Sequence, residues 1–195
     1  MKTRWMMVLA GLVGLCGVAQ ASVVVSLTED SGGVAATASG TLDLTGLSSW
    51  GPDSRSPGLN AGSSYISLGV GGAETRYFTL SGPPNAWGDA GAPSATTASG
   101  DRFTLVAMMG YFATSTSYVS GSELYSTATW AGSTFADFGL TQATYTYTFG
   151  SGEHADSRTV NVIPEPATFL LFGFGGLGAW MLRRNKLKSN VELDD

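Results

Sequence analysis

The chain has 195 residues and a formal net charge of −5, a length that suits one domain with short attachments. Residues 22–166 contain no lysine, and their few arginines are outnumbered by acidic residues scattered along the chain. This balance excludes a cationic surface of the kind that binds nucleic acid or anionic membranes, so no nucleic-acid partner is expected.

Residues 1–21 have the organisation of a secretory signal peptide. Lys2 and Arg4 give a positively charged start, an apolar run follows, and Ala19 and Ala21 place small residues where signal peptidase requires them. We therefore expect a helical signal segment that is cleaved after residue 21. A buried core helix is the alternative, but it fits poorly with the positive flank and the small-residue exit.

The single cysteine, Cys16, lies inside this first apolar run. Once the run is removed, the protein has no thiol nucleophile, no disulfide and no Cys-ligated metal. An acylated Cys16 in a lipoprotein signal is a second interpretation, although such a signal needs a small residue where Leu15 stands.

Residues 22–163 are predicted to form a β-rich domain, because apolar and polar residues alternate through much of this stretch. In residues 34–44 the alternation places the apolar side chains on one face of a strand. The preceding residues 23–27 and the turn-forming residues 29–33 predict an N-terminal hairpin.

A second hairpin is predicted from residues 64–70 and 74–80, which the sequence Gly-Gly-Ala links. Further strands are predicted at residues 102–109, 122–130, 144–149 and 157–163. About eight short alternating strands favour an all-β fold, an antiparallel β-sandwich or jelly roll.

Two long stretches, residues 46–60 and 81–100, are rich in Gly, Pro and Ser and are predicted loops. Residues 133–140 predict a single helical turn. In that turn Thr134 and Asp137 have capping spacing, and a glycine ends it.

Aromatic residues suggest a carbohydrate-binding function. Trp50 and Trp87 lie in the two predicted loops, and flat rings in exposed loops can stack on sugar faces. Trp130, Tyr65 and Tyr111 belong to the same set of rings. Aromatic residues are more often anchors of a core or a loop, and that interpretation stays open beside the first.

Thr144, Thr146 and Thr148 alternate with Tyr145 and Tyr147. Regular threonine arrays can bind ice, but one strand supplies a single row where an ice-binding face needs many. The simpler prediction places the tyrosines toward the core and the threonines toward water.

The sequence Gly-Ser-Gly-Glu-His-Ala-Asp contains Glu153, His154 and Asp156, which could ligate a metal ion or act as an acid–base group. If an ion binds there, Ca²⁺ is the expected one, since acidic loops outside the cell meet it. The alternative is an ordinary loop between two strands, in which Gly150 and Gly152 adopt positive φ and the aspartate accepts backbone N–H groups. We expect no cofactor.

No motif of an enzyme is present. A serine hydrolase would need His154, the only histidine, as its base, yet no G-x-S-x-G turn occurs. A glycosidase with two distant carboxylates stays open, because any pair of acids could converge in the fold. We expect a protein that is not an enzyme.

Residues 167–182 form a second apolar run without a charge. As a helix rising about 1.5 Å per residue, the run spans roughly 24 Å, enough to cross a ~30 Å hydrocarbon core with local thinning. Four basic residues follow it: Arg183, Arg184, Lys186 and Lys188. The positive-inside tendency keeps them and the acidic tail, residues 189–195, in the cytoplasm, with residues 22–163 outside. A core helix is the alternative.

Pro164, Glu165 and Pro166 stand between the predicted domain and this run. Two prolines one residue apart cannot extend a sheet ladder, and they favour extended or polyproline conformation. The result is a stiff, exposed strip with one carboxylate above the membrane, a shape that a protease can recognise.

With its signal peptide, Pro-Glu-Pro, short transmembrane helix and basic cluster in this order, the chain resembles Gram-negative envelope proteins that carry the PEP-CTERM sorting signal. The likeness covers residues 162–188, with Ile163 where valine is usual. It implies that Pro164, Glu165 and Pro166 are the sorting motif. It also implies that a membrane-embedded exosortase removes the tail, so that the protein is exported, transiently anchored and then passed to the cell surface or exopolysaccharide matrix.

Residues 23–47 and 135–166 resemble the ectodomain of one subgroup of these proteins, for which the resemblance supplies no activity. We therefore expect a non-enzymatic structural or interaction role in the exopolysaccharide matrix. A carbohydrate-binding module is the alternative function, with a secreted hydrolase and an ice-binding protein as more remote ones. The expected partners are signal peptidase, the exosortase, the membrane and exopolysaccharide.

Overall fold

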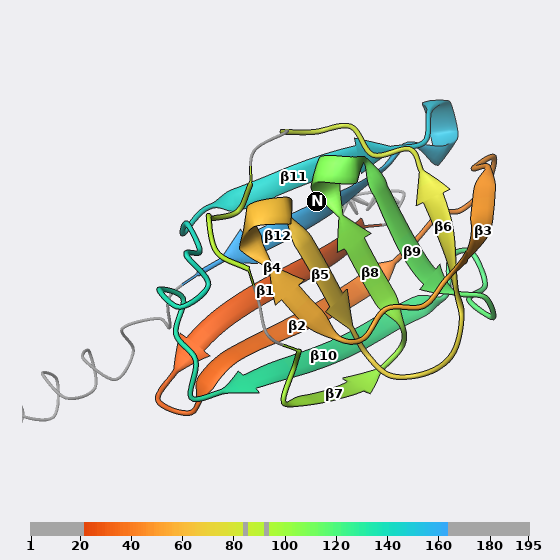
Figure 1. Ribbon diagram of the computed structural model, residues 1–195. Coiled ribbons are helices and arrows are strands. Elements are labelled where there is room, and N and C mark those ends of the chain that lie inside the picture. Colours follow the sequence, from red (N-terminus) through yellow and green to blue (C-terminus); the bar gives the residue numbers. More distant parts are fainter. Residues whose placement is uncertain (1–21, 84–85, 92–93, 164–195) are drawn as a thin grey trace, which may run out of the picture.

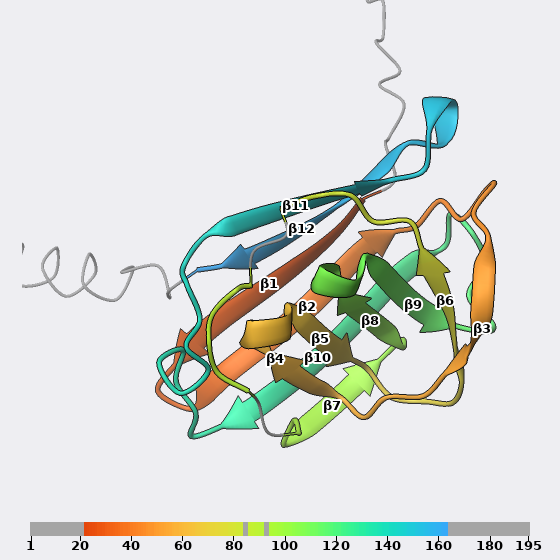
Figure 2. The ribbon, with the colours of Figure 1, turned by 45° about the horizontal axis from the view of Figure 1, so that its top comes forward.

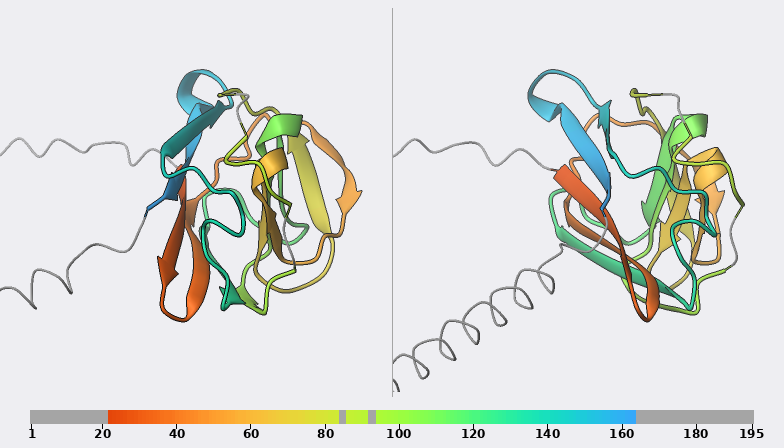
Figure 3. Two further views of the ribbon diagram at one scale, coloured as in Figure 1. Left: turned by 60° about the vertical axis from the view of Figure 1, so that its left-hand side comes forward. Right: turned by 90° about the vertical axis from the view of Figure 1, so that its left-hand side faces the viewer.

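The structure, a computed structural model, describes residues 22–83, 86–91 and 94–163. These residues form two six-stranded β-sheets that pack face to face as the layers of a sandwich (Figures 1 and 3). The first sheet contains, in spatial order, β11 (Thr144–Phe149), β12 (Asp156–Val162), β1 (Ser22–Asp30), β2 (Gly33–Thr41), β10 (Glu123–Ala131) and β7 (Thr97–Gly100).

The second sheet contains, in spatial order, β3 (Ser49–Asp53), β6 (Glu74–Phe78), β9 (Tyr111–Ser115), β8 (Phe103–Val106), β5 (Tyr65–Leu68) and β4 (Gly58–Asn60). Three short 3₁₀ turns complete the regular structure: η1 (Ala61–Ser63), η2 (Ala107–Met109) and η3 (Gly152–His154). The all-β, sandwich-like prediction is confirmed. No helix within residues 22–83, 86–91 and 94–163 has the length and apolar character needed to cross a membrane.

The N-terminal hairpin is present as predicted. β1 and β2 pair antiparallel around a tight turn, in which the Asp30 carboxylate accepts the backbone N–H groups of Gly32 (2.6 Å) and Gly33 (3.1 Å). Along both strands every second residue is buried, among them Val25 and Ala36. The period of two in the sequence therefore matches one face turned to the core.

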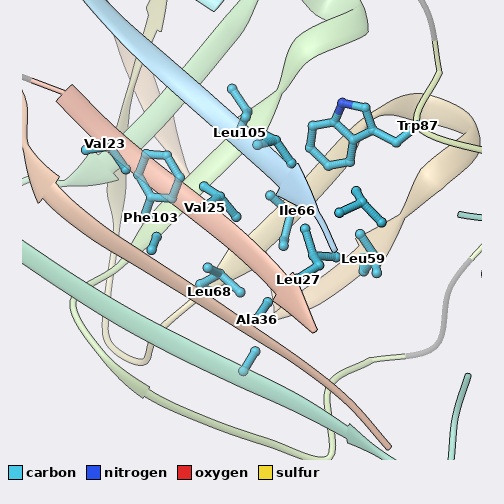
Figure 4. Close-up of a cluster of buried hydrophobic side chains, with 14 of the residues drawn as sticks. Val23, Val25, Leu27, Ala36, Leu59, Ile66, Leu68, Trp87, Phe103 and Leu105 are labelled. Carbon is cyan, nitrogen blue, oxygen red and sulfur yellow. The ribbon is translucent and has the colours of Figure 1, made fainter. Parts of the chain in front are cut away.

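The sandwich core lies between the two sheets and continues under the loop that carries Trp87 (Figure 4). Figure 4 labels Val23, Val25, Leu27 and Ala36 from the first sheet, and Leu59, Ile66, Leu68, Phe103 and Leu105 from the second. The predicted turn at residues 133–140 also packs into this core through Phe135 and Phe138. Its capping bonds are present, since Thr134 and Asp137 exchange hydrogen bonds between side chain and backbone.

The prediction of a purely antiparallel sandwich is wrong at one place, because β1 and β12 pair parallel, from Ser22 beside Ser157 to Leu27 beside Val162. The connection after β10 stays at the end of the sandwich where β10 finishes, and the Gly132 N–H donates to the Gly32 carbonyl there. β11 therefore runs back against the direction of β10. β12, its hairpin partner, consequently returns in the direction of β1.

The second predicted hairpin is also wrong, because β9 and β8 separate β6 from β5 in the sheet. The residues directly after β5 attach to the first sheet instead. The Gly69 N–H donates to the Thr127 carbonyl (3.3 Å), and the Val70 N–H donates to the Gly100 carbonyl (3.1 Å). Gly69 has a φ of 73°, and a Cβ there would lie 1.8 Å from the Asp101 carbonyl oxygen. A glycine thus lets the chain approach the first sheet closely and cross to the far side of the second.

Three strands lie in stretches that were predicted to be loops, namely β3, β4 and β7, and all three are edge strands. β3 contains Pro52 at a bulge, a position where an edge strand tolerates proline because no ladder bond is lost. The strand predicted at residues 102–109 is shorter, since it gives way to η2. Gly110, with a φ of 69°, then turns the chain into β9.

Candidate functional site

The predicted site at Glu153, His154 and Asp156 lies in the connection between β11 and β12, where η3 projects from the sandwich (Figure 1). Asp156 is buried, and its carboxylate accepts the backbone N–H groups of Asp43 (3.1 Å) and Ser157 (2.5 Å). Burial raises its pKa. Glu153 is exposed. Asp156 thus fixes a loop, which is the structural alternative that the sequence left open.

Asp43 holds this loop from the other side. Its carboxylate accepts the Thr45 N–H (2.9 Å) and lies 2.8 Å from His154 Nδ1 and 3.2 Å from Ser120 Oγ. The hydrogen bonds from Thr45 and then His154 hold the pKa of Asp43 well below its usual range. Among the residues that the structure describes, no three His, Cys, Asp or Glu side chains gather as a metal site.

Of the two interpretations left open for Trp87, the structure favours an anchor of the core and loop over a sugar contact, because its side chain is fully buried. Its indole Nε1–H donates to the Tyr147 hydroxyl (2.8 Å), so the ring anchors its loop against β11. Trp130 is also a core residue. On β11 the side chain of Tyr147 faces the core and the three threonines are exposed, as the simpler prediction held.

Trp50, in contrast, is 63% exposed on the edge strand β3. Its ring meets that of Phe78 edge-on at 5.8 Å between centroids, and Phe78 meets Tyr111 at 4.8 Å. The Arg76 guanidinium lies 5.9 Å from the centre of the Phe78 ring. We call Trp50, Arg76, Phe78 and Tyr111 the aromatic patch. It occupies the outer face of the second sheet, where β3, β6 and β9 are neighbours.

The crossing segment, residues 54–57, joins β3 to β4 at the opposite edge of the second sheet and passes over the outer face of that sheet (Figure 2). Arg55, in this segment, lies over the rings of Tyr65 (5.5 Å) and Tyr111 (5.9 Å), and its Nε donates to Asp53 (3.0 Å). Partial burial raises the pKa of Asp53, but the Arg55 guanidinium lowers it more, so the pair stays charged.

A buried polar network lies beneath the crossing segment. Arg102 and Glu74 form an ion pair of 3.1 Å with side chains only 4% and 0% exposed. The Thr104 hydroxyl donates to Glu74 (2.7 Å) and lies 2.9 Å from Ser67 Oγ, while Arg102 also donates to the Arg55 carbonyl. Sequence reasoning missed this network, because its members come from four separate segments that only the fold brings together.

A hollow of about 440 Å³ opens beside the crossing segment, within the usual range for small-ligand sites. Arg55 is its only charged lining residue, and Leu59, Tyr65, Val106 and Met109 supply apolar surface. The remaining lining residues include Ser56, Asn60, Ser63 and Ser94. Arg55 lines this hollow, and its guanidinium also lies over the ring of Tyr111, the buried member of the aromatic patch. The hollow and the patch are therefore neighbours on the outer face of the second sheet.

Arg158 lies in the core, away from the arginines on the outer face of the second sheet. Arg158 points from β12 into the core, fully buried, with its guanidinium carbon 3.3 Å from the centre of the Phe112 ring and 4.2 Å from that of Phe149. None of its three guanidinium nitrogens has a hydrogen-bond partner. Burial lowers the pKa of Arg158 to about 9, so the group keeps its charge at neutral pH. Aromatic faces are its direct contacts in the core, and the charge of Asp156 stabilises it without a direct hydrogen bond.

Other predicted features lie outside the described residues. These are the signal peptide with Ala19 and Ala21, the Pro164-Glu165-Pro166 motif, the apolar run at 167–182, the basic cluster of Arg183, Arg184, Lys186 and Lys188, and the tail. The described fold reaches Ile163, whose N–H donates to the Leu27 carbonyl (3.1 Å).

Comparison with known families and proteins bears on this part of the chain. The family model of the PEP-CTERM protein-sorting motif matches residues 162–185. No curated protein and no solved structure matches the chain. The likeness of residues 23–47 and 135–166 to one subgroup of ectodomains stays a prediction. The chain therefore carries the sorting motif of PEP-CTERM proteins, which marks an exosortase-sorted protein of the cell surface or extracellular space.

Proposed function

We propose that the β-sandwich is a non-enzymatic structural or interaction module of the extracellular matrix, displayed after an exosortase has removed the residues that follow it. In this proposal signal peptidase first cleaves after Ala21 at the inner membrane of a Gram-negative cell. Residues 167–182 then anchor the protein transiently, with the basic cluster that begins at Arg183 on the cytoplasmic side.

The observation that carries the proposal is where the sorting motif begins. The motif starts at residue 162, the last residue of β12. Val162 is buried and its N–H donates to the Ala143 carbonyl (2.9 Å), while Ile163 is half exposed and makes the last backbone bond of the fold. Removal of everything after Ile163 therefore leaves the sandwich complete, and a cut before Val162 takes away a core residue.

The acidic residues of the sandwich support a non-catalytic role. Asp156 and Asp43 are bound to backbone N–H groups and fix loops. Asp53 and Glu74 are paired with arginines. Because these four carboxylates already have structural partners, none of the four is positioned as a free acid or base beside the hollow. The proposed role requires no metal ion or cofactor.

Mass spectrometry of the mature C-terminus in cells that contain an exosortase tests the sorting step. We expect the mature chain to end after Ile163 and to lack residues 191–195. The variant Glu165→Gln should accumulate as an uncleaved precursor, with Glu192→Gln as the control. Recovery of residues 191–195 on most of the surface-exposed protein would replace this proposal with a permanent anchor.

A second candidate function is carbohydrate binding through Trp50. Its support is the contact between two exposed rings, Trp50 (63% exposed) and Phe78 (45%), since adjoining exposed apolar side chains mark interaction sites more often than single ones. Trp87 has no part in this proposal, because it is buried. Binding of the full chain to a glycan array, compared between the wild type and Trp50→Ala, tests it.

A further inference from the structure

The arginines of the sandwich are distributed unevenly between its surfaces. Arg55, Arg76 and Arg102 all lie on the outer face of the second sheet, and Arg158 is in the core. The acidic residues of that face are Asp53 and Glu74, each bound to one arginine. This face is consequently cationic on a protein whose formal net charge is −5.

Arg76 is the arginine of this face that has no carboxylate in direct contact, although Asp53 is close enough to interact with its charge. Within the described ranges 22–83, 86–91 and 94–163 it forms no ion pair, and its buried Nε atom has no hydrogen-bond partner. Its register partner across the β3–β6 ladder is Trp50. An exposed indole ring and an unpaired guanidinium therefore lie side by side on one face.

Rings continue this arrangement across the sheet. From Trp50 the contacts run through the exposed Phe78 to Tyr111, which is buried beneath Arg55. Arg55 then reaches Tyr65 at the border of the hollow, so Trp50, Phe78 and Arg55 are the exposed members of the path. The path leads from β3 over β6, β9 and β8 to β5. At about 4.8 Å per strand it spans roughly 19 Å, long enough for a chain of several sugar units rather than one.

We propose that this surface, from Trp50 to the hollow beside Arg55, binds an acidic polysaccharide whose carboxylates pair with Arg76 and Arg55. The inference rests on the carbohydrate-binding candidate above and adds the chemical class of its ligand. Trp50 provides a platform for the apolar face of a sugar ring. Arg76, beside it, binds the carboxylate of the same or the adjoining unit. A guanidinium can donate two parallel N–H hydrogen bonds to one carboxylate.

Arg55 is suited to a second carboxylate. Its side chain is 38% exposed, and its place in the hollow is fixed by the two tyrosine rings and Asp53. The hydroxyl and amide groups that line the hollow are ordinary partners for sugar hydroxyls. No acidic residue lines this hollow, whereas two others, of about 300 Å³ each, include Glu123.

Two other classes of ligand fit less well. Nucleic acid carries one phosphate per nucleotide and requires several cations along its path, but only two partly exposed arginines are present here. A peptide that adds a strand to an edge would meet Pro52 and the bulge in β3, which interrupt the ladder it needs. A saccharide with spaced carboxylates matches both the rings and the separated charges.

The test measures dissociation constants of the full chain, in detergent micelles, for polygalacturonate and for its fully methyl-esterified form. We expect tighter binding to the acid polymer. Trp50→Ala should weaken binding to both polymers by about tenfold or more, because it removes the stacking platform. Arg76→Gln should weaken only the acid polymer, also by about tenfold, and Arg76→Lys should restore part of the loss.

Tyr125→Ala is the matched control, because Tyr125 is 58% exposed on the outer face of the first sheet. It should bind like the wild type. Equal affinity for the two polymers would overturn the acidic class while leaving sugar binding in place. Binding to poly-glutamate as tight as to polygalacturonate would overturn the saccharide class. Binding to neither form of polygalacturonate would overturn sugar binding and the acidic class together. Loss of binding in Tyr125→Ala would overturn the location. None of these results affects the sorting step.

Discussion

The two outer faces of the sandwich differ, although their inner faces are alike. The outer face of the first sheet is covered by small hydroxyl side chains that bond to one another, such as Thr97 with Thr129 (2.6 Å) and Ser99 with Thr127 (2.7 Å). The outer face of the second sheet carries arginines, large rings and a crossing segment. Strand periodicity decides only which side chains enter the core, so the outward positions are free to differ in chemistry.

The difference teaches where this fold tolerates charge. The cations of the second face are held by partners, either the carboxylates of Asp53 and Glu74 or aromatic rings. On the first face, hydroxyl groups of neighbouring strands bond to one another. None of the four arginines among the described residues lies there.

The largest expected effect comes from removing the carboxylate that holds the second face together. Glu74→Ala leaves the Arg102 guanidinium buried without its counter-ion, and we expect the free energy of unfolding to fall by about 3–5 kcal/mol. Urea denaturation followed by tryptophan fluorescence measures it. Ser99→Ala, on the first face, is the control and should lose no more than about 1 kcal/mol. Equal losses would remove the distinction between the faces.

An intermediate effect of opposite sign is expected in the core. Arg158 has ring faces around it and no hydrogen-bond partner, and Asp156 attracts its charge without a direct hydrogen bond. Such a buried charge costs more than an apolar side chain of similar length. Arg158→Met should raise the free energy of unfolding by about 1–3 kcal/mol, since the lost cation–π contacts offset part of the gain. Thermal unfolding of the two proteins decides it, and a lower Tm for the variant would show that the guanidinium has a stronger partner.

The smallest expected effect concerns pH at the loop end of the first sheet. The pKa of Asp43 is lower in the folded protein than the usual value of 3.8, so its contribution to stability is present above that pH and is lost as the pH falls below it. Asp43→Asn should therefore flatten the fall in Tm between pH 5 and pH 3. Identical pH profiles for wild type and Asp43→Asn would contradict the assignment.

The sequence was most informative where strands are long and central. β1, β2 and β10 have nine residues each, and their alternation made both their existence and their buried face predictable. β3, β4 and β7 were not predicted as strands, because an edge strand needs only a few residues and accepts Gly, Pro and Ser. The partner of a strand was less predictable still, because Gly69 sends the chain toward Asp101 rather than into a hairpin.

The candidate site also has features that the sequence predicted and features that it did not. The exposure of Trp50 and the burial of Trp87 depend on which loop lies over the core, and both residues have similar Gly- and Pro-rich neighbours in the sequence. The loop role of Asp156 was predictable from the glycines around it. The gathering of Arg55, Arg76 and Arg102 was not, because those positions come together only after the second sheet has formed and residues 54–57 have crossed it.

The parallel pairing of β1 with β12 has a mechanical consequence for the stage at which, as we propose, residues 167–182 anchor the protein. Force directed along β12 loads its six paired positions with β1 together in shear, instead of opening them one after another as in a hairpin that is peeled apart.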